Sequence, residues 1–180
     1  MPILALTPFP GRAAPDIRVQ ADIARLPDGA TLRLGWRVTG DIARLAWHGA
    51  GGAGRSDDLW RHGCFEAFVA CGGPAYVELN AAPSRRWAAY AFDDYRAGMR
   101  AAAAAVREQN WTLGAAVAAM ELLVALPDAR AGDDWTAGLS AVIETTGGDL
   151  SYWALAHPGD RPDFHNRNCF VARLPAPGRV

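Results

Sequence analysis

The sequence predicts an all-β fold, an antiparallel β-sandwich that forms a single domain. Short runs of residues that alternate between apolar and polar recur along the chain, and glycine, proline and aspartate separate them at roughly regular spacing. The length of 180 residues fits one domain of this class. We expect an N-terminal arm at 1–15, the sandwich at 16–175 and a C-terminal tail at 176–180.

The first third of the chain predicts a meander of three strands. After the proline-rich arm, residues 17–26, 31–39 and 42–47 alternate as strands do. The segments between them, PDGA and TGD, contain the glycine and aspartate that tight turns need. Trp36 and Trp47 are in phase with apolar neighbours, which predicts that both lie in the core.

The central stretch LWRHGCFEAFVACGGPAYVELN predicts two strands, at 64–70 and 75–81, around a Gly-Gly-Pro turn. Apolar side chains occupy one face of this pair. The opposite face collects carboxylates, an amide and aromatic rings: Glu66, Phe68, Tyr76, Glu78 and Asn80. This mixture is compatible with a ligand surface, and the alternative is a partly covered outer face without a ligand.

The remaining chain supplies further strands. Residues 87–92 predict a strand followed by a loop at 93–99, and 139–145 with 150–155 predict a hairpin around Thr-Gly-Gly-Asp. A last strand is expected at 170–174.

Four segments carry a resemblance to a known family: LWRHGCFEAF, YVELNAAPSRRWAAYAFDDYRAGM, LSAVIE and SYWALAHPGDRPDFH. From about residue 59 to 170 the chain resembles the bacterial DOMON-like proteins, relatives of the family nine carbohydrate-binding modules. The resemblance implies a non-catalytic β-sandwich that binds a sugar or a haem. It also implies strands at 101–109 and 113–126, where local propensity favours helix.

Sugar recognition requires flat rings that pack against C–H faces, and planar donors and acceptors that pair with hydroxyl groups. The sheet face supplies acceptors, and loop edges supply rings. The expected ligand-binding residues are Glu66, Tyr76, Glu78 and Asn80 on the face, Trp60, Trp87 and Trp153 as platforms, and Arg61 and Arg96 as donors. Trp153 is in phase with Leu155, which favours a core position for it instead.

Glu144 is a conditional member of this set. It falls on the strand face opposite Leu139, Ala141 and Ile143. If that strand neighbours the central pair, Glu144 adds a third carboxylate to the same surface. The mutual repulsion of the three carboxylates must then be offset by a cation, an arginine or a proton.

The loop HPGDRPDFH is the weak metal candidate of the sequence, through His157, Asp163 and His165. Imidazole and carboxylate groups are suitable ligands, but the spacing matches no zinc or EF-hand pattern, so a structural loop is expected and no metal is assigned. Haem is the alternative cofactor. Histidines and methionines for an axial pair exist, yet none lies in a stretch that resembles the haem-binding members.

Composition excludes several function classes. The chain has no lysine. This excludes enzymes that form a Schiff base on lysine, P-loop proteins that bind phosphate through a lysine, and kinases that need a lysine on a strand. The glycine-rich 49–58 segment lacks the order of a nucleotide-binding loop, and no GxSxG elbow is present. Glu66 and Glu78 could in principle form a glycosidase pair, but a sheet face offers little to exclude water. We expect a protein that is not an enzyme.

Charge, cysteines and the start of the chain bear on partners and location. A net charge of −1 and the lack of a long apolar run predict neither nucleic-acid nor membrane partners. Three cysteines argue against a disulfide framework. The first segment lacks the pattern of a signal peptide, so we expect a cytoplasmic location. The sequence therefore predicts a small polar ligand, most plausibly a carbohydrate or cell-wall sugar; the alternatives are haem, or a structural or partner-binding domain without a small ligand.

Overall fold

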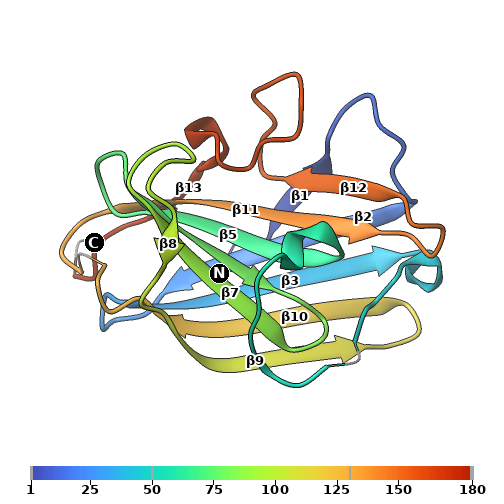
Figure 1. The fold of residues 1–180 in the computed structure, drawn as a ribbon, viewed down its shortest axis with the longest axis horizontal. Helices are drawn as coiled ribbons and strands as arrows, with labels where there is room; N and C mark the ends of the chain where they lie inside the picture. The colour runs from blue at the N-terminus through green and yellow to red at the C-terminus, as the bar shows by residue number, and fades with distance from the viewer. Residues whose placement is uncertain (1, 50, 130, 179–180) are drawn as a thin grey trace.

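The computed structural model describes residues 2–49, 51–129 and 131–178, and nearly all of its regular structure is β (Figure 1). The strands are β1 (Leu4–Pro8), β2 (Ile17–Arg25), β3 (Thr31–Gly40), β4 (Gly54–Arg55), β5 (Cys64–Ala70), β6 (Tyr76–Ala81), β7 (Arg86–Phe92), β8 (Arg100–Ala101), β9 (Ala105–Leu113), β10 (Val117–Ala125), β11 (Trp135–Glu144), β12 (Leu150–Ala154) and β13 (Ala172–Leu174). Three short 3₁₀ helices, η1 (Ile42–Arg44), η2 (Leu59–Arg61) and η3 (Arg167–Cys169), complete the described elements. The predicted all-β sandwich class is confirmed, and no helix in the described ranges is long and apolar enough to cross a membrane.

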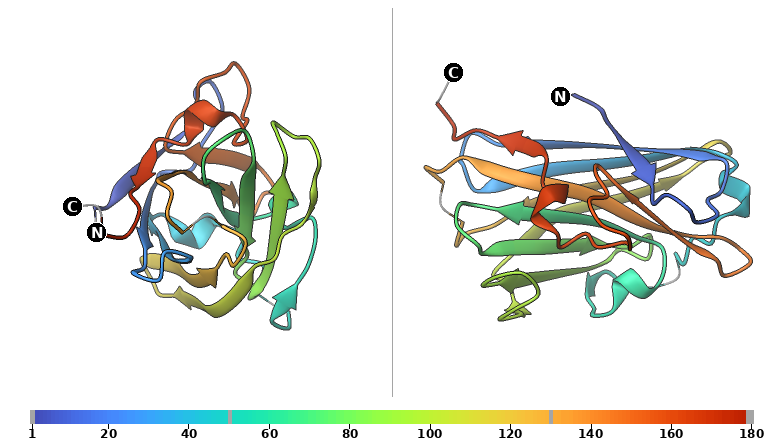
Figure 2. Two further views of the ribbon diagram at one scale, coloured as in Figure 1. Left: turned by 90° about the vertical axis from the view of Figure 1, so that its left-hand side faces the viewer. Right: turned by 90° about the horizontal axis from the view of Figure 1, so that it is seen from above.

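The strands form one curled sheet that folds over itself into two layers (Figure 2). Its order is β4-β7-β6-β5-β11-β12-β1-β2-β3-β10-β9, with β13 beside β11 and β8 beside β7. The link between the layers is β1, whose residues Leu4, Ala5 and Leu6 pair with β2 while Thr7 and Pro8 pair with β12. The expectation that residues 1–15 form an arm is therefore wrong in part, because this segment contains the strand that joins the two layers.

The first hairpin shows how the turn sequence determines local structure. Between β2 and β3, the Asp28 carboxylate accepts hydrogen bonds from the backbone N–H groups of Ala30 and Thr31 at 3.0 and 2.8 Å and from the Thr31 hydroxyl at 2.6 Å. Gly29 has a φ of +72°, a conformation that glycine adopts without steric cost. The PDGA segment therefore reverses the chain as predicted.

The main core lies between the two layers and follows the predicted alternation. Its buried members include Val19 and Ile23 of β2, Leu32, Leu34, Trp36 and Val38 of β3, Met120, Leu122 and Val124 of β10, Phe65, Ala67 and Val69 of β5, Leu79 of β6, and Leu139, Ala141 and Ile143 of β11. Trp47 packs against this cluster, so both tryptophans predicted to be core residues lie there or at its edge. Burial of these inward faces is the main hydrophobic contribution to the fold.

A second apolar cluster covers part of the outer face of β5, β6, β7 and β11. Phe68, Tyr76, Tyr90 and Phe92 from the strands pack with Phe164, Cys169 and Phe170 from the segment between β12 and β13. All seven residues of β5 are consequently buried, since its two faces are covered by different parts of the chain.

Two other predictions about local structure have different outcomes. Residues 42–47 are not a strand: they form η1, after which Leu45 makes a single bridge to Thr145. The stretch with helical propensity does form strands, because β10 pairs along its length with β3 on one side and β9 on the other. Tertiary pairing and burial outweigh the helix propensity of alanine and leucine here.

In the expected C-terminal tail, Ala176 donates its N–H to Asp134 at 2.8 Å, and positions 179–180 lie outside the described residues.

Candidate ligand-binding cavity

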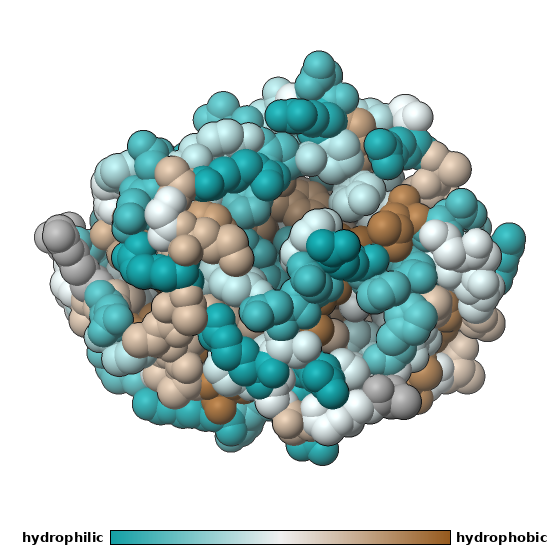
Figure 3. All heavy atoms as spheres, in the orientation of Figure 1, coloured by the Kyte–Doolittle hydropathy of each residue, from teal (hydrophilic) through white to brown (hydrophobic). Residues whose placement is uncertain are grey.

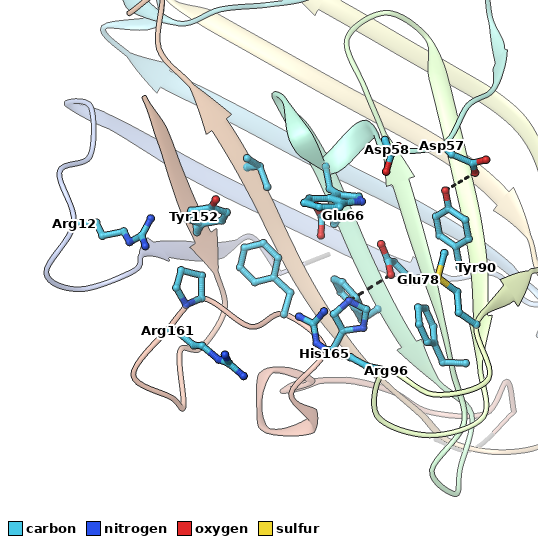
Figure 4. A pocket seen from close by; sticks show the side chains of 17 residues that line it. Arg12, Asp57, Asp58, Glu66, Glu78, Tyr90, Arg96, Tyr152, Arg161 and His165 are labelled. Carbon is cyan, nitrogen blue, oxygen red and sulfur yellow. Dashed lines mark hydrogen bonds and ion pairs between the residues drawn. The ribbon is translucent and has the colours of Figure 1, made fainter. Parts of the chain in front are cut away.

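The outer face of the β5–β6–β7 layer carries a cavity of about 880 Å³. Strands form its floor, and the segments before η2, after β7 and after β12 form its walls (Figure 4). Its lining residues are Arg12, Asp57, Asp58, Trp60, Glu66, Phe68, Glu78, Tyr90, Phe92, Arg96, Met99, Val142, Tyr152, Arg161, Pro162, Phe164 and His165. Figure 3 shows that hydrophilic side chains cover most of this side of the molecule, with smaller apolar patches between them.

Glu66 lies at the floor of the cavity and is only 3% exposed. Its Oε1 has no hydrogen-bond partner among the described residues, and neither has the buried hydroxyl of Ser140, the residue paired with Glu66 across β5 and β11. Burial raises the pKa of Glu66 well above its usual range, and Glu78 raises it further while Arg96 opposes the change. A buried polar group without a partner costs stability, so this carboxyl group is suited to a ligand that completes its hydrogen bonds.

Glu78 is the second buried carboxylate of the cavity. The Asn80 amide donates a hydrogen bond to Glu78 Oε1 at 2.7 Å, and Glu78 Oε2 lies 3.7 Å from His165 Nε2. Burial raises the pKa of Glu78, against the effects of the Asn80 hydrogen bond and of Arg96. Asn80 is itself buried and does not line the cavity, so it orients Glu78 and does not face a ligand directly.

His165 connects the wall formed by the 157–165 loop to the strands. Its Nδ1 is hydrogen-bonded to the Tyr76 hydroxyl at 2.7 Å, and its ring makes edge contacts with Phe68 and Phe92 at centroid distances of 5.0 and 5.1 Å. Burial lowers the pKa of His165 to about 4, and Arg96 also lowers it. The imidazole is therefore neutral over the physiological pH range.

The same wall contains an ion pair between Arg96 Nη2 and Asp163 Oδ1 at 2.9 Å. Asp163 also accepts a hydrogen bond from the Tyr95 hydroxyl at 2.7 Å. Desolvation opposes ionisation of Asp163, but the hydrogen bonds from Tyr95 and Arg96 outweigh it and lower the pKa of this carboxyl. These contacts tie the loop after β7 to the segment after β12.

The opposite wall is formed by the residues that precede β5. The Tyr90 hydroxyl donates a hydrogen bond to Asp57 at 2.6 Å, and Trp60 is 49% exposed at the cavity edge. Asp58 has a φ of +61° and Arg96 a φ of +52°, both unusual for residues with side chains. Two cavity-lining residues are thus held in costly backbone conformations, a feature that concentrates at functional sites.

Charges in the cavity are separated in space. Figure 4 shows Arg12, Tyr152 and Arg161 on one side and Asp57 and Asp58 on the other, with the floor carboxylates between them. The Arg12 guanidinium lies 5.7 Å from the centre of the Tyr152 ring. Neither Arg12 nor Arg161 forms an ion pair within the described ranges.

The structure brings some of the predicted residues to the cavity and places others elsewhere. Glu66, Glu78, Arg96 and Trp60 line it; Tyr76 and Asn80 lie directly behind it, hydrogen-bonded to His165 and Glu78. Arg61 pairs with Asp58 at 3.2 Å outside the lining.

Two predicted platforms and the third carboxylate are corrected. Trp87 packs against the main core because it alternates in phase with Ala89, and Trp153 is buried in that core, as its phase with Leu155 favoured. Glu144 does lie on the strand next to β5, but beyond the end of the β5 ladder. Its carboxylate contacts His48 and His62 and does not line the cavity.

The three weak metal candidates have separate partners. His157 Nε2 contacts the Thr7 carbonyl oxygen at 2.8 Å, whereas Asp163 pairs with Arg96 and His165 with Tyr76. Each of the three side chains thus contacts a different part of the chain, and the structural role of the loop stays a prediction.

Sequence reasoning missed a group of lining residues: Arg12, Asp57, Asp58, Tyr90, Tyr152 and Arg161. The phase of 87–92 could have indicated Tyr90, since it alternates with the inward-facing Trp87 and Ala89. No local pattern identifies Arg12, which belongs to the segment interpreted as an arm.

Comparison with known proteins supports the fold. No protein-family model matches the sequence, and no curated protein matches it significantly. Among solved structures, the chain is similar to the crystal structure of a "putative carbohydrate-binding protein" from Bacteroides uniformis, with a TM-score of 0.61 and 15% identity over 95% of this chain and 85% of that one. It is also similar to a family nine carbohydrate-binding module from Caldicellulosiruptor kristjanssonii in complex with glucose, with a TM-score of 0.49 and 11% identity over 79% and 69%. The chain therefore shares its overall β-sandwich fold with the Bacteroides uniformis protein.

Proposed function

We propose that this chain is a non-catalytic saccharide-binding domain, related to the DOMON-like proteins, and that it binds a sugar in the cavity on the outer face of β5, β6 and β7. The observation that carries the proposal is Glu66, a buried carboxyl group that lines the cavity and has an unpartnered oxygen among the described residues. A sugar hydroxyl group placed there would supply the missing hydrogen bond.

Size and composition of the cavity agree with this ligand class. Its volume of about 880 Å³ lies within the usual range of small-molecule sites. Trp60 and Tyr152 offer ring faces for C–H groups, while Glu66, Glu78 and Arg96 offer planar hydrogen-bonding groups. The similarity of the fold to the Bacteroides uniformis protein described as a "putative carbohydrate-binding protein" supports the same ligand class.

The electrostatics favour binding over hydrolysis. A retaining glycosidase pairs a protonated acid with an ionised nucleophile. Here burial raises the pKa of both Glu66 and Glu78, so it disfavours in each the ionised form that the nucleophile of such a pair requires. We therefore propose that bound sugar is released unchanged. The cytoplasmic location and the lack of nucleic-acid or membrane partners stay predictions.

Haem binding is the second candidate, favoured by one observation. His165 and Met99, residue types that form axial pairs, both line the cavity. Two buried carboxyl groups at the floor disfavour a macrocycle there. Titration of the purified protein with haemin separates the candidates: we expect no Soret band that saturates at one equivalent, and a stoichiometric band lost in His165→Gln and in Met99→Leu would establish haem instead.

The saccharide proposal is tested by thermal-shift screening followed by calorimetric titration. A panel of neutral hexoses, uronic acids and amino sugars should include at least one that raises the melting temperature, because a ligand selective for the folded state stabilises it. For that sugar, Glu66→Gln should weaken binding by about 1.5–3 kcal/mol, roughly ten- to a hundredfold, since a charge-assisted or buried hydrogen bond is lost.

The matched control is Glu121→Gln, which makes the same chemical change on an exposed position of β10 in the other layer. It should leave the affinity unchanged. If no sugar of the panel binds, or if Glu66→Gln binds as tightly as the unmodified protein, the saccharide site is not in this cavity.

A further inference from the structure

His48, His62 and Glu144 form a second polar cluster, outside the residues that line the cavity. His48 Nε2 and His62 Nδ1 each lie 3.0 Å from the same oxygen, Glu144 Oε2. One ligand atom from each residue lies within 4.8 Å of the other two, and the imidazole rings are 5.0 Å apart between centroids. Three residues distant in the sequence thus direct two nitrogens and an oxygen at one point.

Strand pairing brings these side chains together. The β5–β11 ladder ends at Cys64 and Val142. His62 lies two residues before Cys64 and Glu144 two residues after Val142, so both lie just beyond the same end of the ladder. Beyond the end of this ladder, on the same edge of β11, the Ala46 N–H donates to the Glu144 carbonyl oxygen at 2.8 Å, and Leu45 bridges to Thr145. This pairing fixes the backbone that leads to His48.

The segment that carries His48 is anchored to the core as well. The Trp47 indole N–H donates to the Ile42 carbonyl oxygen at 3.3 Å, and its ring lies 5.0 Å from that of Trp111. Glu144 and His48 therefore come from backbone held by the sheet or the core, whereas the His62 N–H closes η2 by donating to the Leu59 carbonyl oxygen at 3.2 Å.

Two imidazole nitrogens and one carboxylate oxygen are the kind of donor atoms that first-row transition ions prefer. Imidazole nitrogen and carboxylate oxygen bind Zn²⁺ at about 2.0–2.2 Å, and two such donors around a tetrahedral ion lie roughly 3.3 Å apart. The two observed nitrogen–oxygen separations of 3.0 Å need to open by only a few tenths of an ångström, and the two imidazole nitrogens already lie within 4.8 Å of each other. Two nitrogen donors disfavour Ca²⁺ and Mg²⁺, which prefer oxygen.

Access and charge also suit a cation. The side chains of His48 and His62 are 55% and 63% exposed, whereas that of Glu144 is 13% exposed. A partly buried carboxylate at the base and two accessible imidazoles above it leave the fourth position of a tetrahedral ion open to water.

We propose that His48, His62 and Glu144 bind a divalent first-row transition ion, with Zn²⁺ as the main candidate. The site would fasten the segment before β5, which carries Asp57, Asp58 and Trp60 to the cavity, onto the end of β11. It does not depend on the nature of the cavity ligand.

The experiment is calorimetric titration of ZnCl₂ into the full chain after chelator treatment and without a histidine tag. We expect one equivalent to bind, with no comparable binding of CaCl₂ or MgCl₂. His48→Asn, His62→Asn and Glu144→Gln should each weaken zinc binding at least tenfold. Cobalt chloride should give a visible absorption spectrum with the unmodified protein that His62→Asn loses.

The matched control is His157→Asn, which removes a half-buried histidine outside the cluster. It should bind zinc as the unmodified protein does. Circular dichroism of each variant checks folding, and the exposure of the two histidines makes unfolding by their substitution unexpected. The proposal is wrong if no zinc binds at one equivalent, or if all three cluster variants keep full affinity.

Discussion

The two faces of β5, β6 and β11 are both buried, but different parts of the chain cover them. Strands of the other layer cover the inner face and leave an apolar core that includes Phe65, Leu79 and Leu139. The segment between β12 and β13 and the loops around β7 cover the outer face, and they leave a cavity over Glu66 and Glu78. Alternation within a strand therefore decides which residues share a face, and what covers that face decides their role.

The two faces also differ in the kind of polar group left without a partner. Within the described ranges, the outer face holds two buried oxygens without a hydrogen-bond partner, Glu66 Oε1 and Ser140 Oγ, from facing positions of β5 and β11, whereas the inner core holds one such atom, the indole nitrogen of Trp36. Such groups lower stability and persist where they serve another purpose. We expect substitutions on the inner face to change folding and those on the outer face to change binding or its pH dependence.

The largest expected effect separates two tryptophans. Trp153→Ala removes a ring buried in the inner core and should lower the free energy of unfolding by about 3–5 kcal/mol, because the cavity left behind cannot collapse fully. Trp60→Ala, at the exposed cavity edge, should change it by less than about 0.5 kcal/mol. Urea denaturation of both variants measures the difference; equal losses would show that the outer edge is as structural as the core.

The second prediction concerns the pH dependence that Glu66 contributes. Its pKa in the folded state is raised above the ordinary value of 4.5, so the folded state holds the proton more tightly and loses stability as pH rises above about 4.5. Glu66→Gln lacks this loss. The stability of the variant relative to the unmodified protein should therefore increase with pH from 4.5 upward, as denaturant titrations at several pH values would reveal. A decreasing difference would mean that Glu66 is held ionised by a partner.

His165 should give the opposite pH dependence. Its pKa is lowered from 6.5 to about 4, so between these values the unfolded chain takes up a proton that the folded protein does not. Unmodified protein should lose stability as pH falls from 6.5 to 4, and His165→Gln should lose less over the same range. Parallel curves for the two proteins would show that the imidazole is solvated and not part of the buried wall.

The smallest effect is expected at the cationic side of the cavity. If a uronic acid binds, its carboxylate can reach Arg12 or Arg161, and an exposed pair of this kind contributes about 0.2–1 kcal/mol. Arg161→Gln should thus weaken the uronic acid severalfold at low salt and leave the matching neutral hexose unchanged. Equal losses for both sugars would indicate a steric role, and calorimetry with the two ligands makes the distinction.

The share of the site that sequence could predict follows from strand phase. Glu66 and Glu78 were placed on one face by alternation, and both line the cavity. Trp87 is predicted at a surface because it begins a strand beside a loop, but it alternates in phase with the buried Ala89, so its side chain packs against the core. Arg12 and Arg161 could not be found, because nothing local indicates which loop a distant strand will meet.

By itself, the sequence determined the β class, most strands and the two faces of the central pair, because alternation and turn residues act over a few neighbouring positions. Only the tertiary structure decided that Leu4–Pro8 joins the two layers, that the helix-prone stretch becomes β10, and that Glu144 lies between two histidines. These features depend on hydrogen bonds and burial between segments far apart in the chain, and their partners are set by strand order, which no local pattern encodes.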